Sequence, residues 1–196
     1  MLKKVFIGYY DAANLTTIVG MLFALVACFF AFEGDIRLAM VCLIIAGVAD
    51  LFDGQVARKL KRTEDAKSFG VQLDSLVDVV SFGIAPVVIA FCSGETTVYA
   101  IVAYALYLIA AVVRLAYFNA VTALGDRRFF QGLPVTYAAL IVPIVFLLDM
   151  PPVHVAAFVA LAVLFIVNVK IPKPRGVFYI LFPLLAVVLI VAWCLL

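Results

Sequence analysis

The chain has 196 residues, of which 68% are hydrophobic and 13% are charged, and its net charge is +2. A soluble domain could not bury so much apolar surface, so the composition excludes an ordinary soluble protein and predicts a membrane protein. Nothing in the composition or the charge indicates a nucleic-acid partner.

The chain opens with residues 1–11, MLKKVFIGYYD, where Lys3 and Lys4 precede apolar and aromatic side chains. This pattern predicts a short interfacial helix on the cytoplasmic leaflet of a membrane, with a flexible N-terminus as the alternative. Residues 12–196 are then expected to form a single transmembrane domain.

Seven apolar segments follow, at residues 12–32, 36–58, 69–92, 96–120, 133–149, 152–169 and 176–196. Most are close to the ~20 residues that a helix needs to span a bilayer, so they predict an all-α polytopic membrane protein. Pro143 and Pro183 are expected to kink their helices, and Gly83 with Pro86 to bend the third span. Because the fifth and sixth segments are short, six or eight spans stay open.

Basic residues fall on one side of these spans. With a cytoplasmic N-terminus, only Arg37 is outside and Arg114 lies within the fourth span. This bias predicts a multi-pass protein of the cytoplasmic (inner) membrane. The residues on the inner side are Lys3, Lys4, Arg58, Lys59, Lys61, Arg62, Lys67, Arg127, Arg128, Lys170, Lys173 and Arg175.

Four aspartates, Asp50, Asp53, Asp74 and Asp78, interrupt two otherwise apolar segments. An ionised side chain at the bilayer centre costs roughly 2.5 to 3.5 kcal/mol on insertion scales, so four of them need compensation. Arg58 is the only basic residue within the two stretches that carry them, residues 50–58 and 70–78, and salt bridges therefore cannot pair all four.

At about 100° per residue, each helix presents two aspartates beside residues with little or no side chain. Carboxylates without a nearby His or Cys suit a hard cation such as Mg²⁺, Mn²⁺ or Ca²⁺, and the small residues leave room for a bulky ligand. The spacing therefore predicts a metal site between two helices. The stripes are Asp50, Asp53, Gly54 and Ala57, and Gly70, Asp74 and Asp78.

These residues resemble the signature of the CDP-alcohol phosphotransferase family, D-x-x-D-G-x-x-A-R, a spacer, and G-x-x-x-D-x-x-x-D. The matching positions are Asp50, Asp53, Gly54, Ala57, Arg58, Gly70, Asp74 and Asp78. Two further stretches, DSLVDVVSFGIAP at 74–86 and RLAYFN at 114–119 followed by GLPVTYA at 132–138, resemble its phosphatidylserine synthase branch. The chain departs from that branch at Tyr117 and Thr136, where Arg and Pro are more usual.

The resemblance implies a six-helix core, to which a seventh span would be an addition, and a homodimer. It implies transfer of a phosphatidyl group from CDP-diacylglycerol to the hydroxyl of a small alcohol, with release of CMP. The leading acceptor is L-serine, and choline, inositol phosphate and glycerol 3-phosphate stay open. Two divalent cations are implied, Mg²⁺ or Mn²⁺, with Ca²⁺ as the alternative.

The resemblance also implies residue roles. Asp50, Asp53 and Asp74 would ligate the two cations, and Asp78 would ligate one of them and act as the general base. The residues implied for CDP-diacylglycerol binding are Asn14, Asp50, Gly54, Ala57, Arg58 and Gly70.

Simpler roles are open for two of these residues and for Arg114. Asn14 could only cap the first helix, and Arg58 could only anchor the chain at the membrane surface, as Arg62 is predicted to do. Arg114 could snorkel to the interface, but an intramembrane Arg predicts a contact with the substrate phosphates or an acceptor carboxylate.

A cation transporter is the alternative from another class, because intramembrane aspartates are also typical of transporters. The sequence shows no inverted repeat, and all four acids cluster at one end of the spans. Both observations favour the transferase.

Overall fold

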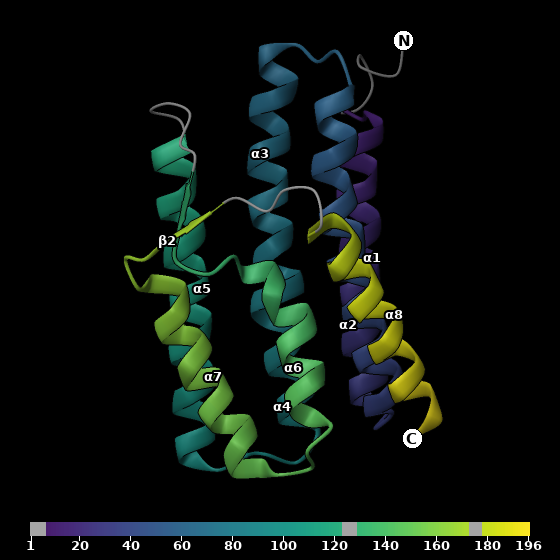
Figure 1. Cartoon of the computed structure of the whole chain (residues 1–196), viewed down its shortest axis with the longest axis vertical. Helices are drawn as coiled ribbons and strands as arrows, with labels where there is room; N and C mark the ends of the chain where they lie inside the picture. Colours follow the sequence, from purple (N-terminus) through teal and green to yellow (C-terminus); the bar gives the residue numbers. More distant parts are fainter. Residues whose placement is uncertain (1–6, 123–128, 173–177) are drawn as a thin grey trace.

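The computed structural model describes residues 7–122, 129–172 and 178–196, which are almost entirely helical (Figure 1). One helical unit corresponds to each predicted apolar segment. These are α1 (Ala12–Phe32), α2 (Ile36–Lys59), a continuous helix of α3 (Glu64–Asp78), a π-helical turn (Val79–Ile84) and α4 (Ala85–Cys92), α5 (Val98–Thr122), a 3₁₀ turn (Val135–Tyr137) with α6 (Ala138–Phe146), α7 (Pro151–Ile166) and α8 (Phe178–Leu195).

Length and composition confirm a multi-pass membrane protein. Three helical stretches, Ala12–Phe32, Glu64–Cys92 and Val98–Val121, are long and apolar enough to cross a bilayer. Shorter apolar helices at Val135–Phe146, Pro151–Ile166 and Tyr179–Leu195 accompany them. The predicted all-α polytopic fold is therefore confirmed.

The helices form one bundle in which α1, α2 and α3 lie side by side, α8 packs along α2, and α5 packs with α7 (Figure 1). The turn from α2 to α3 lies at the upper end, and the α4–α5 and α6–α7 turns lie at the lower end. A short antiparallel pair, β1 (Phe129–Gln131) and β2 (Lys170–Pro172), places Gln131 opposite Lys170. Three-residue strands are too short for an alternating pattern, so the sequence did not predict them.

Side-chain caps begin the first three helices. The carboxylates of Asp11 and Asp35 accept hydrogen bonds from the main-chain amides of Asn14 and Leu38, each at 3.0 Å. The Thr63 hydroxyl caps α3 in the same way. Small residues then allow α1 and α2 to approach closely, as in many membrane helix pairs. A Cβ atom at Gly20 would lie 3.3 Å from the Ala49 methyl group.

The predicted bend in the third span takes the form of the π-helical turn at Val79–Ile84, which directly follows Asp78. Its wider winding is visible in the amide of Ala85, which donates to Val80, five residues earlier. Pro86 has no amide hydrogen, so it cannot donate to the Phe82 carbonyl four residues before it. The hydroxyl of Tyr107 on α5 donates to that carbonyl instead.

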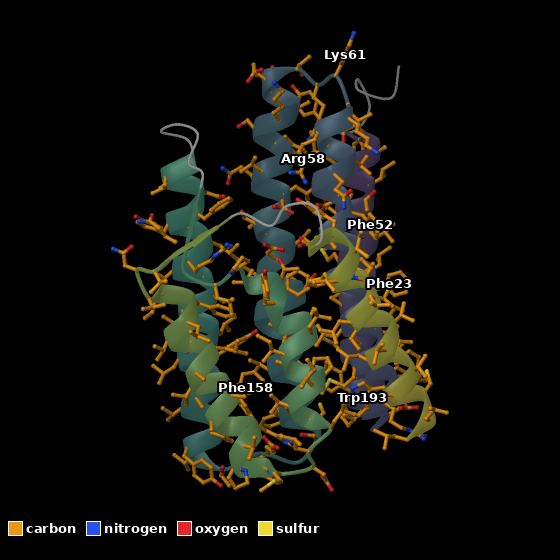
Figure 2. The ribbon with its side chains drawn as sticks, in the orientation of Figure 1. Phe23, Phe52, Arg58, Lys61, Phe158 and Trp193 are labelled. Atoms are coloured by element: carbon orange, nitrogen blue, oxygen red, sulfur yellow. The ribbon has the colours of Figure 1, made fainter. Side chains whose placement is uncertain are left out.

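Aromatic rings fill the contact between α5 and α7. The ring of Phe158, within the bundle in Figure 2, stands edge-on to Tyr104 and Tyr107, with centroids 4.9 Å away in both cases. Near the lower end, the ring of buried His154 on α7 forms a hydrogen bond with Glu95, whose carboxylate also accepts a hydrogen bond from the Tyr104 hydroxyl. This group holds the α4–α5 connection against α7.

The predicted N-terminal interfacial helix is absent from the part of residues 1–11 that the structure describes. Residues 7–11 form a bend and an extended lead into α1, so the predicted interfacial helix does not reach them. Residues 1–6 lie outside the described residues. Pro143 and Pro183 lie inside α6 and α8, and the kinks expected at them stay predictions.

Candidate active site between α2 and α3

Three of the four predicted aspartates meet where α2 faces α3. Carboxylate oxygens of Asp50, Asp74 and Asp78 all lie within 4.8 Å of one another. We call these three residues the aspartate cluster. Asp74 and Asp78 reach it together because residues four apart lie on one helix face. Asp78 is buried, and the other two are partly buried.

Hydroxyl groups from other helices orient two aspartates of α2. The Thr136 hydroxyl donates to Asp50 Oδ2 at 2.8 Å, and the Thr17 hydroxyl donates to Asp53 Oδ2 at 2.5 Å. Asp53 thus turns toward α1, outside the aspartate cluster. In Asp78, by contrast, buried Oδ1 has no hydrogen-bond partner among the described residues.

A cavity of about 180 Å³ opens beside these carboxylates, between α1, α2 and α3. We call it the α2–α3 cavity. Both Asp53 and Asp74 line it, so Asp74 belongs to the cavity and to the aspartate cluster. A Cβ atom at Gly54 would meet no other atom within 4 Å, and so Gly54 faces open space. Of the residues predicted to bind the nucleotide, Asn14, Gly54, Ala57 and Gly70 line this cavity.

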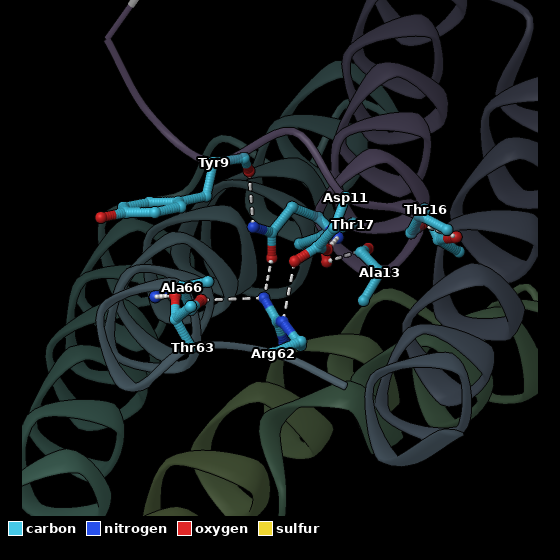
Figure 3. Close-up of polar contacts among 10 residues, drawn as sticks. Tyr9, Asp11, Ala13, Thr16, Thr17, Arg62, Thr63 and Ala66 are labelled. Atoms are coloured by element: carbon cyan, nitrogen blue, oxygen red, sulfur yellow. Dashed lines mark hydrogen bonds and ion pairs between the residues drawn. The ribbon is translucent and has the colours of Figure 1, made fainter. Parts of the chain in front are cut away.

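Arg62 also lines the α2–α3 cavity, although the sequence predicted only a surface anchor. Its side chain is 9% exposed, and its Nε lies 2.8 Å from Asp11 Oδ2 (Figure 3). Its Nη2 donates to Asn14 Oδ1 at 2.7 Å and to the Ala66 carbonyl at 2.9 Å. The surface-anchor prediction for Arg62 is therefore wrong, because its contacts with Asp11 and Asn14 hold the guanidinium against α1 and away from the surface.

Two neighbours determine how Arg62 and Asn14 fit together. A Cβ atom at Gly70 would lie 2.5 Å from Arg62 Nη2 and 2.9 Å from Asn14 Oδ1, so only glycine leaves room for this contact. The Asn14 amide also donates to the Tyr9 carbonyl at 2.7 Å. The oxygen and the nitrogen of the Asn14 side chain are therefore both engaged. Asn14 does not cap α1, because the side chain of Asp11 is the cap.

Arg58 points away from the α2–α3 cavity and toward α8. Its Nε donates to the Gly54 carbonyl at 3.0 Å, and its Nη2 donates to the Tyr179 hydroxyl at 2.8 Å. Its guanidinium carbon lies 5.6 Å from the centre of the Tyr179 ring. A direct nucleotide contact by Arg58 stays a prediction.

Arg114 is buried within α5, at 7% exposure, and does not snorkel to the surface. Its guanidinium lies 5.1 Å from the Phe118 ring centre and interacts electrostatically with all three members of the aspartate cluster. It also lines a second cavity, of about 240 Å³, with Tyr117, Gln131 and Asn168. We call this the Arg114 cavity.

The model of the CDP-alcohol phosphatidyltransferase family matches residues 10–195, which is nearly the whole chain. The chain belongs to this family. The resemblance drawn from the aspartate motif is thereby confirmed.

Relatives in the family are similar over large parts of the chain. The archaetidylserine synthase of Methanothermobacter thermautotrophicus is 33% identical over 147 residues, which are 74% of this chain and 62% of that protein. The CDP-diacylglycerol–serine O-phosphatidyltransferase of Helicobacter pylori is 30% identical over 179 residues, which are 86% of this chain and 74% of that protein. A Saccharomyces cerevisiae protein with the same name is 38% identical over a shorter part, 92 residues, which are 43% of this chain and 32% of that protein.

In this family member the aspartate cluster fits a divalent cation. Its ligands are carboxylate oxygens, the type that hard cations prefer, and one buried oxygen of Asp78 lacks a hydrogen-bond donor among the described residues. Arg114 supplies one positive charge to three carboxylates, which leaves an excess of negative charge when all are ionised. A bound cation would offset that excess.

Proposed function

We propose that this chain transfers a phosphatidyl group from CDP-diacylglycerol to the hydroxyl of L-serine, releasing CMP and forming phosphatidylserine. The observation that carries the proposal is the convergence of Asp50, Asp74 and Asp78 beside the open space at Gly54, in a member of this family. The names of the Helicobacter pylori and yeast relatives support serine as the acceptor.

In this proposal the four aspartates hold two divalent cations, Mg²⁺ or Mn²⁺, with Ca²⁺ as the alternative. When bound, the ions would neutralise charge on the pyrophosphate and on the leaving CMP. Asp74 is placed to coordinate a cation at either end of the site, because it lines the α2–α3 cavity and also belongs to the aspartate cluster. Asp53, on the cavity side, would serve the nucleotide end.

The nucleotide would occupy the α2–α3 cavity. Gly54 offers it space, and Asn14 presents an amide that Arg62 and Tyr9 hold in a fixed orientation. Ala57 and Gly70 add walls without bulky side chains. Arg58 would support the nucleotide site indirectly, because its guanidinium donates a hydrogen bond to the main-chain carbonyl of Gly54.

Asp78 would act as the general base. The acceptor hydroxyl oxygen forms a bond to the β-phosphorus, the bond from that phosphorus to the CMP oxygen breaks, and the hydroxyl proton passes to Asp78. The buried Oδ1 of Asp78 is suited to accept a proton, because no described residue donates to it. Positioning by the surrounding helices would supply much of the acceleration.

Arg114 would bind the acceptor. A planar guanidinium matches a carboxylate with two parallel hydrogen bonds, and serine carries a carboxylate whereas choline does not. Inositol phosphate and glycerol 3-phosphate would need more positive charge, yet Arg114 is the only basic residue among the described residues that line its cavity. These features favour serine.

The site would face the cytoplasm from the inner membrane. Arg58 and Lys61 lie toward the end where α2 turns into α3, and Trp193 lies toward the other end (Figure 2). Of the lysines and arginines in the described part of the chain, only Arg37, in the first turn of α2, lies near that other end. This bias supports a cytoplasmic site, where nucleotide and serine arrive from water while the acyl chains stay in lipid. A homodimer stays a prediction from the resemblance.

The test is CMP release from CDP-diacylglycerol by the purified protein in detergent, with Mn²⁺ or Mg²⁺. Serine, choline, inositol phosphate and glycerol 3-phosphate are offered in separate reactions. We expect release with serine, abolished by a chelator. Release with another acceptor alone would overturn the serine assignment and keep the chemistry. No release with any acceptor, from folded protein, would overturn the transferase and return attention to cation transport.

A further inference from the structure

Three polar side chains form a hydrogen-bonded row along the Arg114 cavity. The Tyr117 hydroxyl on α5 donates to Gln131 Oε1 at 2.7 Å, and Gln131 Nε2 donates to Asn168 Oδ1 at 3.2 Å. All three residues line the cavity together with Arg114. We call them the Tyr117–Gln131–Asn168 row.

The main chain fixes this row across segments that are distant in sequence. Gln131 ends β1 and pairs with Lys170 at the start of β2, two residues after Asn168. The amide of Gly132 also donates to the Val169 carbonyl at 3.1 Å. The short sheet therefore holds Gln131 and Asn168 side by side, beside the helix that carries Tyr117 and Arg114.

The direction of the hydrogen bonds determines what the row can offer a ligand. Tyr117 has a single hydroxyl proton and donates it to Gln131, so its oxygen is left with acceptor capacity only. Asn168 Oδ1 accepts one hydrogen bond and has a second lone pair. The row thus presents the Tyr117 oxygen and Asn168 Oδ1 as neutral acceptors, beside the side-chain N–H groups of Asn168, in the cavity that Arg114 also lines.

We propose that the Tyr117–Gln131–Asn168 row binds the ammonium group of the acceptor while Arg114 binds its carboxylate, so that the cavity selects an amino acid among small alcohols. The inference rests on the proposed function and names the residues behind its specificity. An ammonium group brings three donors, which complement oxygen acceptors, and a carboxylate complements the guanidinium.

The same chemistry disfavours the other acceptors. The quaternary ammonium of choline has no N–H to donate, and ethanolamine has no carboxylate for Arg114. A phosphate needs donors, which the Tyr117 oxygen cannot supply while its proton is directed at Gln131. A useful probe is 3-hydroxypropanoate, which has the hydroxyl and carboxylate of serine but lacks the ammonium group.

The experiment compares kcat/KM for serine with kcat/KM for 3-hydroxypropanoate in the full-length protein, measured as CMP release. The variants are Tyr117→Phe and Asn168→Ala. Both side chains are exposed, so neither variant should prevent folding. Tyr99→Phe is the matched control, because it removes an exposed tyrosine hydroxyl from the other end of α5.

We expect each variant to lower the preference for serine about tenfold, the effect of one hydrogen bond to a charged group. KM for CDP-diacylglycerol should stay unchanged in both variants, and Tyr99→Phe should keep the full preference for serine. A merely structural role would lower both kcat/KM values together and leave their ratio unchanged, which would overturn the inference.

Failure of the proposed function would look different. A wild-type protein that releases no CMP with serine would overturn the proposed function, and this inference with it. Wild-type turnover of serine with the same preference in Tyr117→Phe and Asn168→Ala would overturn this inference alone.

Discussion

The hydroxyl of Tyr107 donates a hydrogen bond to the main-chain carbonyl of Phe82. Pro86, four residues after Phe82, has no amide hydrogen to donate to that carbonyl. Tyr107 is fully buried on α5, the helix that also carries Arg114. The contact therefore joins the irregular part of the third span, directly after Asp78, to the helix whose Arg114 and Tyr117 line the Arg114 cavity.

Tyr107→Phe should destabilise the protein, because the Phe82 carbonyl would lose its side-chain donor in an apolar environment. We expect a loss of about 1 to 3 kcal/mol in the free energy of unfolding. Thermal or denaturant unfolding in detergent measures it. Tyr99→Phe, at an exposed position on the same helix, should change stability little, and equal effects of the two substitutions would contradict the account.

Asp78→Asn should abolish turnover while the protein still folds. The amide cannot accept the acceptor proton, and loss of a general base lowers rates by about 10²–10⁴-fold. CMP release with serine gives the rate, and unfolding in detergent reports the fold. Asp149→Asn, an exposed change at the opposite end of the bundle, is the matched control. Substantial activity in Asp78→Asn would remove Asp78 from the role of base.

Gly54→Ala and Gly70→Ala should differ in their effects, because Gly54 faces open space whereas Gly70 packs against other side chains. A methyl group at Gly54 meets no protein atom, and alanine favours a helix over glycine, so we expect an unfolding temperature that does not fall and a KM for CDP-diacylglycerol raised about tenfold or more. At Gly70 it meets Arg62 and Asn14, so stability should fall as well. A Gly54→Ala protein with wild-type KM would show that the nucleotide does not approach there.

Divalent cations should stabilise the folded protein even without substrate. A ligand at 100 times its dissociation constant stabilises by about 2.7 kcal/mol, so Mn²⁺ should raise the unfolding temperature and a chelator should reverse the change. Asp74→Asn should weaken this response, and Asp149→Asn should keep it. An unfolding temperature that changes with neither Mn²⁺ nor chelator would argue against a cation at the aspartate cluster.

The sequence predicted the membrane helices because their apolar runs are long, and it predicted the meeting of Asp50, Asp74 and Asp78 because helical periodicity puts them on facing stripes. The same periodicity did not show that Asp53 lies apart from the aspartate cluster. A separation of three residues turns the side chain by about 60° and shifts it about 4.5 Å along the axis, far enough for Thr17 to hold it against α1.

Residues outside regular helices were harder to predict. Arg62 lies in the connection before α3, where no periodicity indicates the direction of a side chain, and it looked like its basic neighbours Lys59 and Lys61. The Tyr117–Gln131–Asn168 row depends on pairing between β1 and β2, which are distant in sequence. Such long-range pairing leaves no local pattern in the chain.

The contact between Arg58 and Tyr179 gives the last helix a role in the site. Because α8 lies along α2 and its Tyr179 accepts from an arginine of the aspartate motif, a rearrangement of α8 would be transmitted to the Gly54 carbonyl and the wall of the α2–α3 cavity. The span beyond the six-helix core would thus support the part of α2 that borders the proposed nucleotide site.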